Sequence, residues 1–278
     1  MIKKQKRVFL IILLTAIFLI SAAMMVRQQI QYQKIVADSD EAAQITGLQN
    51  SEAPRQSTSP LPVSPAEPEE PELPPEPLPE DALDLANIDL EALRAVNEDV
   101  VGWIAIPGTT LSYPLMQGEN NQYYLSHSWK RESVVGGSVF LEATSNRDLT
   151  GFHTIAYAHR MRNDTMFGTI KYYKKLDYWQ EHPNVYIVLD DTIYRYDIFS
   201  AQEASVKGIV FRLDIEETHS EEKFLQYCIE NSVIDTGLTP EADDRILTLS
   251  TCTGNGHANR WVVHGVLAQE YSRELKEE

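Results

Sequence analysis

Basic residues are scarce in this chain. It has 24 Lys and Arg against 41 Asp and Glu among 278 residues, a formal net charge of −17. A phosphate-binding surface needs clustered Lys and Arg, so this balance argues against nucleic acid as a partner. The sequence also lacks the GxGxxG and GxxxxGKS/T patterns of nucleotide-binding loops and the compact CxxC and HxxxH spacing of zinc sites. We therefore expect neither a cofactor nor a metal.

One long apolar run stands at the N-terminus, over residues 8–26. At about 1.5 Å per residue it nearly crosses a hydrocarbon core of about 30 Å. The basic residues at positions 3, 4, 6 and 7 favour a cytoplasmic tail over residues 1–7. These patterns predict a single-pass cell-membrane protein whose later residues are extracellular. A cleaved signal peptide is the alternative, because small residues at 21–23 resemble a cleavage site.

Residues 27–80 read as an extracellular linker rich in Pro and Glu. Ten of the fourteen prolines lie between Pro54 and Pro79, in a segment with no aromatic residue. Such a segment cannot form a packed core, and it favours an extended spacer. The folded domain is then expected over residues 81–278.

The pattern of that domain is mixed α/β and mainly β. After a short helix capped by Asp89, alternating apolar residues predict strands at 100–106, 111–116, 138–141, 154–158, 184–189, 192–200, 246–251 and 261–267. Short helices are expected at 166–173, 175–181 and 220–231. Many short strands with few helices indicate a β-barrel of about eight strands rather than a doubly wound sheet.

The last two expected strands carry the most informative side chains. Residues alternate within 247–252, so Ser250 and Cys252 share one face, and a new strand starts at Arg260 after a Gly-containing loop. If the strands are neighbours, Cys252 and Arg260 face each other across the loop. The structural alternative is a buried core cysteine beside a surface arginine.

Cys228 is the second cysteine, and it lies on the apolar stripe of the helix expected at 220–231. A role as a small core residue is favoured for it. A Cys228–Cys252 disulfide is the alternative in an exported protein.

A thiol nucleophile needs an acid–base partner. His159 follows the apolar run TIAYA and opens a polar loop, where catalytic side chains often lie. His264 shares the Arg260 face but stands about 13 Å further along the strand. His257, in the loop itself, is a third candidate. A metal site built from Cys252 and these three histidines is a further alternative.

Several motifs together resemble a known family. TLSTC followed closely by an arginine, with YAHRMRNDTMFG upstream, is similar to the sortases, and most similar to the class B sortases of Gram-positive bacteria. The segments VVGWIAIPGTTLSYPLMQGENNQYYL and GGSVFLEATSN carry the same resemblance, which covers roughly residues 88–268. The order of His before Cys also separates the chain from papain-like enzymes.

The resemblance implies a sortase-type barrel and a cysteine transpeptidase with His159, Cys252 and Arg260 as its catalytic residues. It implies substrates that are surface proteins with a C-terminal sorting signal, NPxTN-like in class B, cleaved after Thr through a thioester. The acceptor would be an amine of a peptidoglycan precursor or of a pilin. Four residues are expected to line the substrate groove: Tyr157, Ser250, Asn121 and Leu125.

Two other functions fit the same residues. An exported cysteine peptidase or amidase would use water as the acceptor in place of an amine. A membrane-tethered binding module would use no chemistry, and its Cys252 would be an inert structural thiol.

Overall fold

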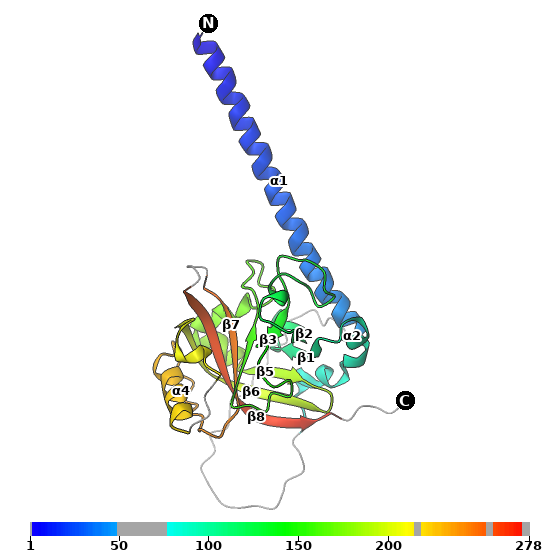
Figure 1. Cartoon of the computed structure of the whole chain (residues 1–278), viewed down its shortest axis with the longest axis vertical. Helices are drawn as coiled ribbons and strands as arrows, with labels where there is room; N and C mark the ends of the chain where they lie inside the picture. The colour runs from blue at the N-terminus through cyan, green and yellow to red at the C-terminus, as the bar shows by residue number, and fades with distance from the viewer. Residues whose placement is uncertain (1, 49–76, 214–217, 254–257, 274–278) are drawn as a thin grey trace, which may run out of the picture.

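The computed structural model describes residues 2–48, 77–213, 218–253 and 258–273. Its centre is a closed barrel with the strand order β1-β2-β3-β4-β7-β8-β6-β5 (Figure 1). The strands are β1 (Val100–Ala105), β2 (Ser112–Met116), β3 (Val139–Leu141), β4 (His153–Tyr157), β5 (Asn184–Val188), β6 (Thr192–Ser205), β7 (Ile246–Cys252) and β8 (Asn259–Ser272). The predicted class, mainly β with short helices around a barrel of about eight strands, is confirmed.

Short helices surround the barrel. They are η1 (Glu80–Asn87), α2 (Leu90–Val96), η2 (Tyr123–Leu125), η3 (Thr169–Lys174), α3 (Leu176–Glu181), η4 (Ile209–Phe211) and α4 (Thr218–Glu230). Asp89 caps α2 as expected, because its carboxylate accepts a hydrogen bond of 2.8 Å from the backbone N–H of Ala92. The helix expected at 166–173 is a 3-10 helix that begins at Thr169, since Met166 has a φ of 54° that no right-handed helix accommodates.

Strand β7 is buried on both faces. Leu247 and Leu249 point into the cluster of apolar side chains that fills the barrel. On the other face, Ile246 belongs to a second cluster that includes Phe224 and Cys228 of α4. β7 pairs in parallel with β4 and antiparallel with β8, so it lies between these two strands in the barrel wall, with α4 packed on its outer face. This burial on both sides makes β7 a rigid base for the residue at its end.

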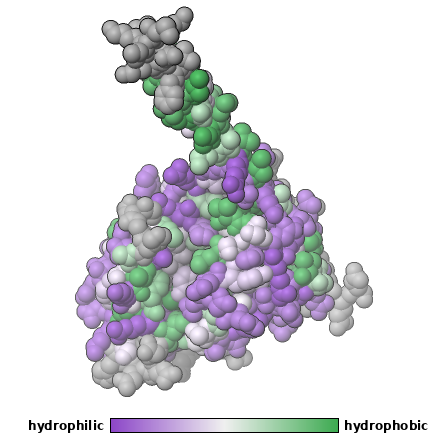
Figure 2. Space-filling view, turned by 45° about the horizontal axis from the view of Figure 1, so that its top comes forward, coloured by the Kyte–Doolittle hydropathy of each residue, from purple (hydrophilic) through white to green (hydrophobic). Residues whose placement is uncertain are grey.

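The N-terminal helix α1 (Ile2–Ile45) projects from the barrel as a long rod (Figure 1). Figure 2 shows apolar residues over the projecting part, against a largely hydrophilic domain surface. The helix is long and apolar enough to cross a membrane. It also runs further than the sequence suggested, because residues 27–45, expected to belong to an extended linker, are helical.

The reason for this difference is visible in the sequence. Residues 27–45 contain no Pro or Gly and are rich in good helix formers such as Gln and Ala. Ile35 and Ala42 of this part are buried against the domain, which adds packing energy to the helix. The Pro- and Glu-rich residues 49–76 lie outside the described residues.

Candidate active site

Three strand ends meet at one end of the barrel. β4 and β7 run in parallel, so their last residues, Tyr157 and Cys252, lie at the same edge of the sheet. β8 runs antiparallel to β7, and its second residue, Arg260, is the direct partner of Cys252 in the strand register. The expected placement of Cys252 opposite Arg260 is confirmed. His159 lies two residues beyond the end of β4, at the same edge.

His159 stands between the thiol and a backbone carbonyl. Its Nε2 donates a hydrogen bond of 2.8 Å to the carbonyl oxygen of Leu125. Its imidazole also hydrogen-bonds with the Cys252 thiol. A ring nitrogen that donates to a carbonyl must carry a proton, so Nδ1 is the nitrogen available to the thiol. The Leu125 carbonyl therefore fixes both the tautomer and the orientation of the imidazole.

The pKa of the Cys252 thiol is lowered, and the pKa of the His159 imidazole is raised. The hydrogen bond with His159 is the largest influence on Cys252 and lowers the pKa of the thiol, helped by the positive charges of Arg260 and Arg160 and opposed by burial. The pKa of His159 is raised, first by its hydrogen bond with Cys252 and further by the Leu125 carbonyl, while burial and Arg260 oppose the rise. Both shifts favour a thiolate paired with an imidazolium.

The pKa of the second cysteine, Cys228, shifts in the opposite direction to that of Cys252. Cys228 lies on the barrel-facing side of α4, where it is fully buried, and burial raises the pKa of its thiol. Both cysteines are free, so the alternative of a Cys228–Cys252 disulfide is wrong. The core role expected for Cys228 is confirmed by its place among the apolar side chains between α4 and the barrel.

A second group of side chains is organised around Glu142. The Tyr157 hydroxyl donates a hydrogen bond of 2.9 Å to Glu142 Oε2, and the Asn121 side-chain amide donates to Glu142 Oε1. The side-chain Oδ1 of Asn121 accepts a hydrogen bond of 2.8 Å from the backbone N–H of Ala143. Burial, followed by the nearby Glu142 charge, raises the pKa of Tyr157, and the charge of Arg260 opposes the rise. Glu142 therefore links Asn121 to Tyr157, beside the Cys252–Arg260 pair.

Ser250 lies directly opposite Tyr157 in the β4–β7 register. It is buried, and its hydroxyl has no hydrogen-bond partner among the described residues. Leu125 reaches the site through its carbonyl, whereas its side chain is 40 % exposed. All seven residues singled out from the sequence thus lie at one end of the barrel or contact a residue there.

The rival histidine His264 lies elsewhere. His264 is fully buried, with Nδ1 at 2.8 Å from the Thr248 hydroxyl and Nε2 at 3.2 Å from the Gln202 amide nitrogen. Both ring nitrogens are therefore engaged in the core, and burial lowers the pKa of His264 to about 3. It is not the partner of Cys252. His257 falls outside the described residues, within which no cluster of three His, Cys, Asp or Glu side chains is placed to hold a metal.

Comparison with known proteins decides the family. The model of the sortase domain family matches residues 104–268, more than half of the chain. The chain belongs to the sortase family. It is 33% identical over 162 residues to sortase B of Staphylococcus aureus, an alignment that covers 58% of this chain and 66% of that protein. The chain thus spans about two thirds of the length of this curated relative.

Solved sortase structures agree with the assignment. The Staphylococcus aureus sortase B–substrate complex superposes with a TM-score of 0.61 at 31% identity, covering 65% of this chain and 84% of that one. Sortase B from B. anthracis gives a TM-score of 0.65 at 26% identity and covers 86% of this chain and 99% of that one. Sortases are transpeptidases, and the resemblance to class B is confirmed.

Sequence reasoning missed two parts of this site. Glu142 stands in GGSVFLEATSN, the segment quoted for the sortase resemblance, yet nothing in its spacing shows that it meets Tyr157 of a different strand. The function of Leu125 as a carbonyl acceptor could not be seen either, because backbone groups leave no mark in residue identity. The nearest signal in the sequence was the glycine at position 137, a residue type often used where the backbone must turn sharply or pack closely. In the structure Gly137 has a φ of 58°.

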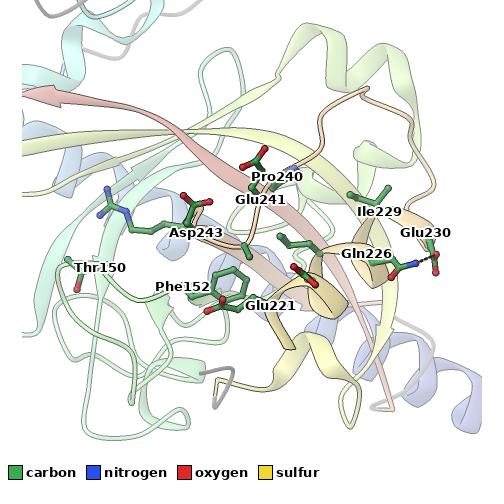
Figure 3. Close-up of a pocket in the computed structure, with 13 residues that line it drawn as sticks. Thr150, Phe152, Glu221, Gln226, Ile229, Glu230, Pro240, Glu241 and Asp243 are labelled. Carbon is green, nitrogen blue, oxygen red and sulfur yellow. Dashed lines mark hydrogen bonds between the residues drawn. The ribbon is translucent and has the colours of Figure 1, made fainter. Parts of the chain in front are cut away.

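A large crevice of about 1020 Å³ lies away from this site (Figure 3). It is formed by α4, by the residues that precede β4 and by the loop that leads into β7, with Phe152, Ile229 and Pro240 beside carboxylates such as Glu221 and Asp243. The crevice opens at the start of β7, whereas Cys252 ends that strand, roughly 20 Å away at about 3.3 Å per residue. It does not belong to the sortase site.

Proposed function

We propose that this sortase cleaves the C-terminal sorting signal of surface proteins after its Thr residue and transfers the protein to an amine. The observation that carries the proposal is the position of the Cys252 thiol, between the imidazole of His159 on one side and Arg260 on the neighbouring strand. We assign Cys252 as the nucleophile, His159 as the general acid and base, and Arg260 as the oxyanion stabiliser.

The first half-reaction forms a covalent intermediate. The Cys252 thiolate attacks the Thr carbonyl carbon, and the carbonyl oxygen becomes an oxyanion. Arg260 is permanently charged and carries several N–H donors, so it stabilises this oxyanion. The His159 imidazolium then gives its proton to the leaving amine as the peptide C–N bond breaks. The product is a thioester between Cys252 and the Thr acyl group.

The second half-reaction reverses these roles. An acceptor amine attacks the thioester carbonyl, neutral His159 removes the proton from the attacking nitrogen, and the Cys252 thiolate leaves. We propose that the acceptor is an amine of a peptidoglycan precursor or of a pilin. No cofactor takes part, because the thiol, the imidazole and the guanidinium supply the nucleophile, the proton transfers and the charge stabilisation.

The substrate groove follows from the same geometry. Tyr157 and Ser250 lie side by side, Tyr157 at the end of β4 and Ser250 two residues before the end of β7. Asn121 joins them through Glu142, and Leu125 adds a partly exposed side chain beside His159. We assign these four residues to the recognition of an NPxTN-like signal. The hydroxyl of Ser250 is buried without a partner among the described residues, so a substrate group can bond to it only once a neighbouring side chain has moved.

The proposed topology rests on α1. Large apolar side chains between Leu10 and Val26 are exposed along the helix, and none of the apolar window is buried in the domain. The basic residues at positions 3, 4, 6 and 7 favour a cytoplasmic tail. We propose a cell-membrane protein with a single span over residues 8–26 and an extracellular catalytic domain.

The test uses the full chain in detergent micelles and a small library of sorting-signal peptides. We expect mass spectrometry to detect an acyl-enzyme on Cys252, and a transfer product only when a peptide with a free amine is present. Cys252→Ala is the control and should give neither. Release of the hydrolysed peptide, with a free carboxylate after its Thr residue, at the same rate with and without the amine would refute transfer and indicate a peptidase. Absence of an acyl-enzyme with every peptide, together with slow alkylation of Cys252, would indicate a binding module.

A further inference from the structure

The membrane-proximal helix and the catalytic histidine are connected by one loop, formed by residues 126–137. The loop starts directly after Leu125, whose carbonyl holds His159, and ends at Gly137, just before β3. It folds back on itself, because the Val134 N–H donates to the Ser126 carbonyl at 2.9 Å and the Ser138 N–H donates to the Tyr124 carbonyl at 2.9 Å. Because these hydrogen bonds join the two ends of the loop, a displacement of residues 134–138 also moves residues 124–126.

The helix α1 holds the loop through polar contacts. The Trp129 indole N–H donates a hydrogen bond of 2.9 Å to the Asp38 carbonyl. Lys130 forms ion pairs with Asp38 at 3.2 Å and with Glu41 at 2.6 Å. A further ion pair of 2.9 Å joins Lys34 to Glu132. These contacts lie on the part of α1 that follows the exposed apolar stretch.

An apolar contact extends the connection to the histidine. Ile35 of α1 is 1 % exposed, and a Cβ added at Gly136 would lie 2.6 Å from its Cδ1. On the other side, a Cβ at Gly137 would lie 2.9 Å from the Leu125 carbonyl oxygen. Gly136 thus packs closely against Ile35 of the helix, and its neighbour Gly137 packs closely against the carbonyl that orients His159.

We propose that residues 34–42 of α1 act as a positioning element for the active site, holding the 126–137 loop so that the Leu125 carbonyl keeps His159 in place for Cys252. The proposal rests on the function assigned above to His159. It means that the segment beside the membrane helps to set the reactivity of the thiol, in addition to connecting the domain to the anchor.

The test is Gly136→Ala in the full chain in detergent micelles. The new methyl group must displace the loop or Ile35, because a separation of 2.6 Å is too close for two carbon atoms. Losing the Leu125 hydrogen bond lowers the pKa of His159, which leaves less imidazolium to stabilise the thiolate. We expect the alkylation of Cys252 by iodoacetamide at neutral pH to slow about fivefold, the factor that corresponds to one ordinary hydrogen bond. The midpoint of its pH profile should move upward.

Three variants make the test specific, and a fourth replaces Gly136→Ala if that variant does not fold. Gly151→Ala is the matched control, because a Cβ there meets nothing within 4 Å, and it should alkylate at the parent rate. Val36→Ala changes an exposed side chain of the same helix and should also leave the rate unchanged. Adding Ile35→Ala to Gly136→Ala returns space to the new methyl group and should restore most of the rate. If Gly136→Ala does not fold, Trp129→Phe removes the hydrogen bond to Asp38 together with part of the buried indole ring, and it should slow alkylation in the same direction.

The outcomes separate this inference from the proposed function. A Gly136→Ala profile identical to that of Gly151→Ala would overturn the positioning role, even if peptide transfer is normal. A slowed profile that Ile35→Ala does not rescue would also overturn it. Failure of the parent chain to form an acyl-enzyme would refute the proposed function, whereas the alkylation profiles would still decide whether α1 controls the thiol.

Discussion

Replacing Arg260 by lysine tests whether the guanidinium contributes geometry as well as charge. Arg260 is the register partner of Cys252, and its charge lowers the pKa of the thiol and opposes the rise in the pKa of Tyr157. Lysine keeps the charge but replaces a planar fork of donors with a single ammonium on a flexible stem. Arg260→Lys should therefore preserve the thiolate and lose the oriented donors for the oxyanion.

The expected magnitude follows from the step in which the donors act. Loss of one oxyanion donor costs about 2.7–4 kcal/mol, or about 10²–10³ in rate. The oxyanion exists only in the transition state and the tetrahedral intermediate, so the loss should fall on kcat and leave KM nearly unchanged. Arg260→Ala removes the charge as well, so it should lower kcat further and move the alkylation profile of Cys252 to higher pH.

The assay combines steady-state kinetics on a sorting-signal peptide with the pH profile of iodoacetamide alkylation, using circular dichroism to confirm folding. Arg160→Ala is the matched control, because Arg160 also lowers the pKa of Cys252 by its charge but is not the register partner of the thiol. It should shift the alkylation profile slightly and change kcat little. If both Arg260 variants fold and keep kcat within about threefold of the parent, Arg260 is not the oxyanion stabiliser.

Three further predictions follow from the same structure. Iodoacetamide should label one thiol per folded chain, Cys252, and a second equivalent on Cys228 before unfolding would contradict the burial of that thiol. His159→Ala should abolish acyl-enzyme formation in mass spectrometry and move the alkylation midpoint of Cys252 to higher pH, and an unchanged midpoint would show that the imidazole does not stabilise the thiolate. Burial lowers the pKa of His153 to about 4 and of His264 to about 3, below the unfolded value of about 6.5. The unfolded chain then binds more protons, so urea unfolding should show stability falling below pH 6.5 by up to about 1.4 kcal/mol per pH unit for each histidine, and a flat profile between pH 6.5 and about 4 would refute these shifts.

The barrel could be predicted from the sequence because its strands are short, apolar and separated by clear turns. The pairing of Cys252 with Arg260 was predictable for a simpler reason, since two strands that follow each other around a short loop usually pair. The ends of β6 and β8 were less predictable. β6 continues to Ser205 and β8 to Ser272, both beyond the expected strands, with polar residues such as Glu203 and Glu270 on their exposed positions.

Long-range contacts set the limit of prediction within the site. Asn121, Glu142 and Tyr157 come from three separate parts of the chain, and only the closed barrel brings their polar atoms together. The docking of α1 was hidden for the same reason. The end of the apolar membrane-spanning run at Arg27 can be read from charge alone. The burial of Ile35, in contrast, depends on its contact with Gly136, about a hundred residues later in the chain.

The local charges around Cys252 act against the charge of the whole molecule. A net charge of −17 disfavours a thiolate in principle. At physiological ionic strength, however, charges more than about 8 Å apart are largely screened where solvent separates them. The groups that set the pKa of Cys252 are near neighbours at the ends of β4 and β8: the His159 imidazole in contact with the thiol, and the charges of Arg260 and Arg160. A partly buried pair is screened much less than surface charges, so these few cations outweigh many distant carboxylates. The reactivity of the thiol therefore depends on how firmly His159 and Arg260 are held, by the Leu125 carbonyl and by the β7–β8 register, more than on the overall charge.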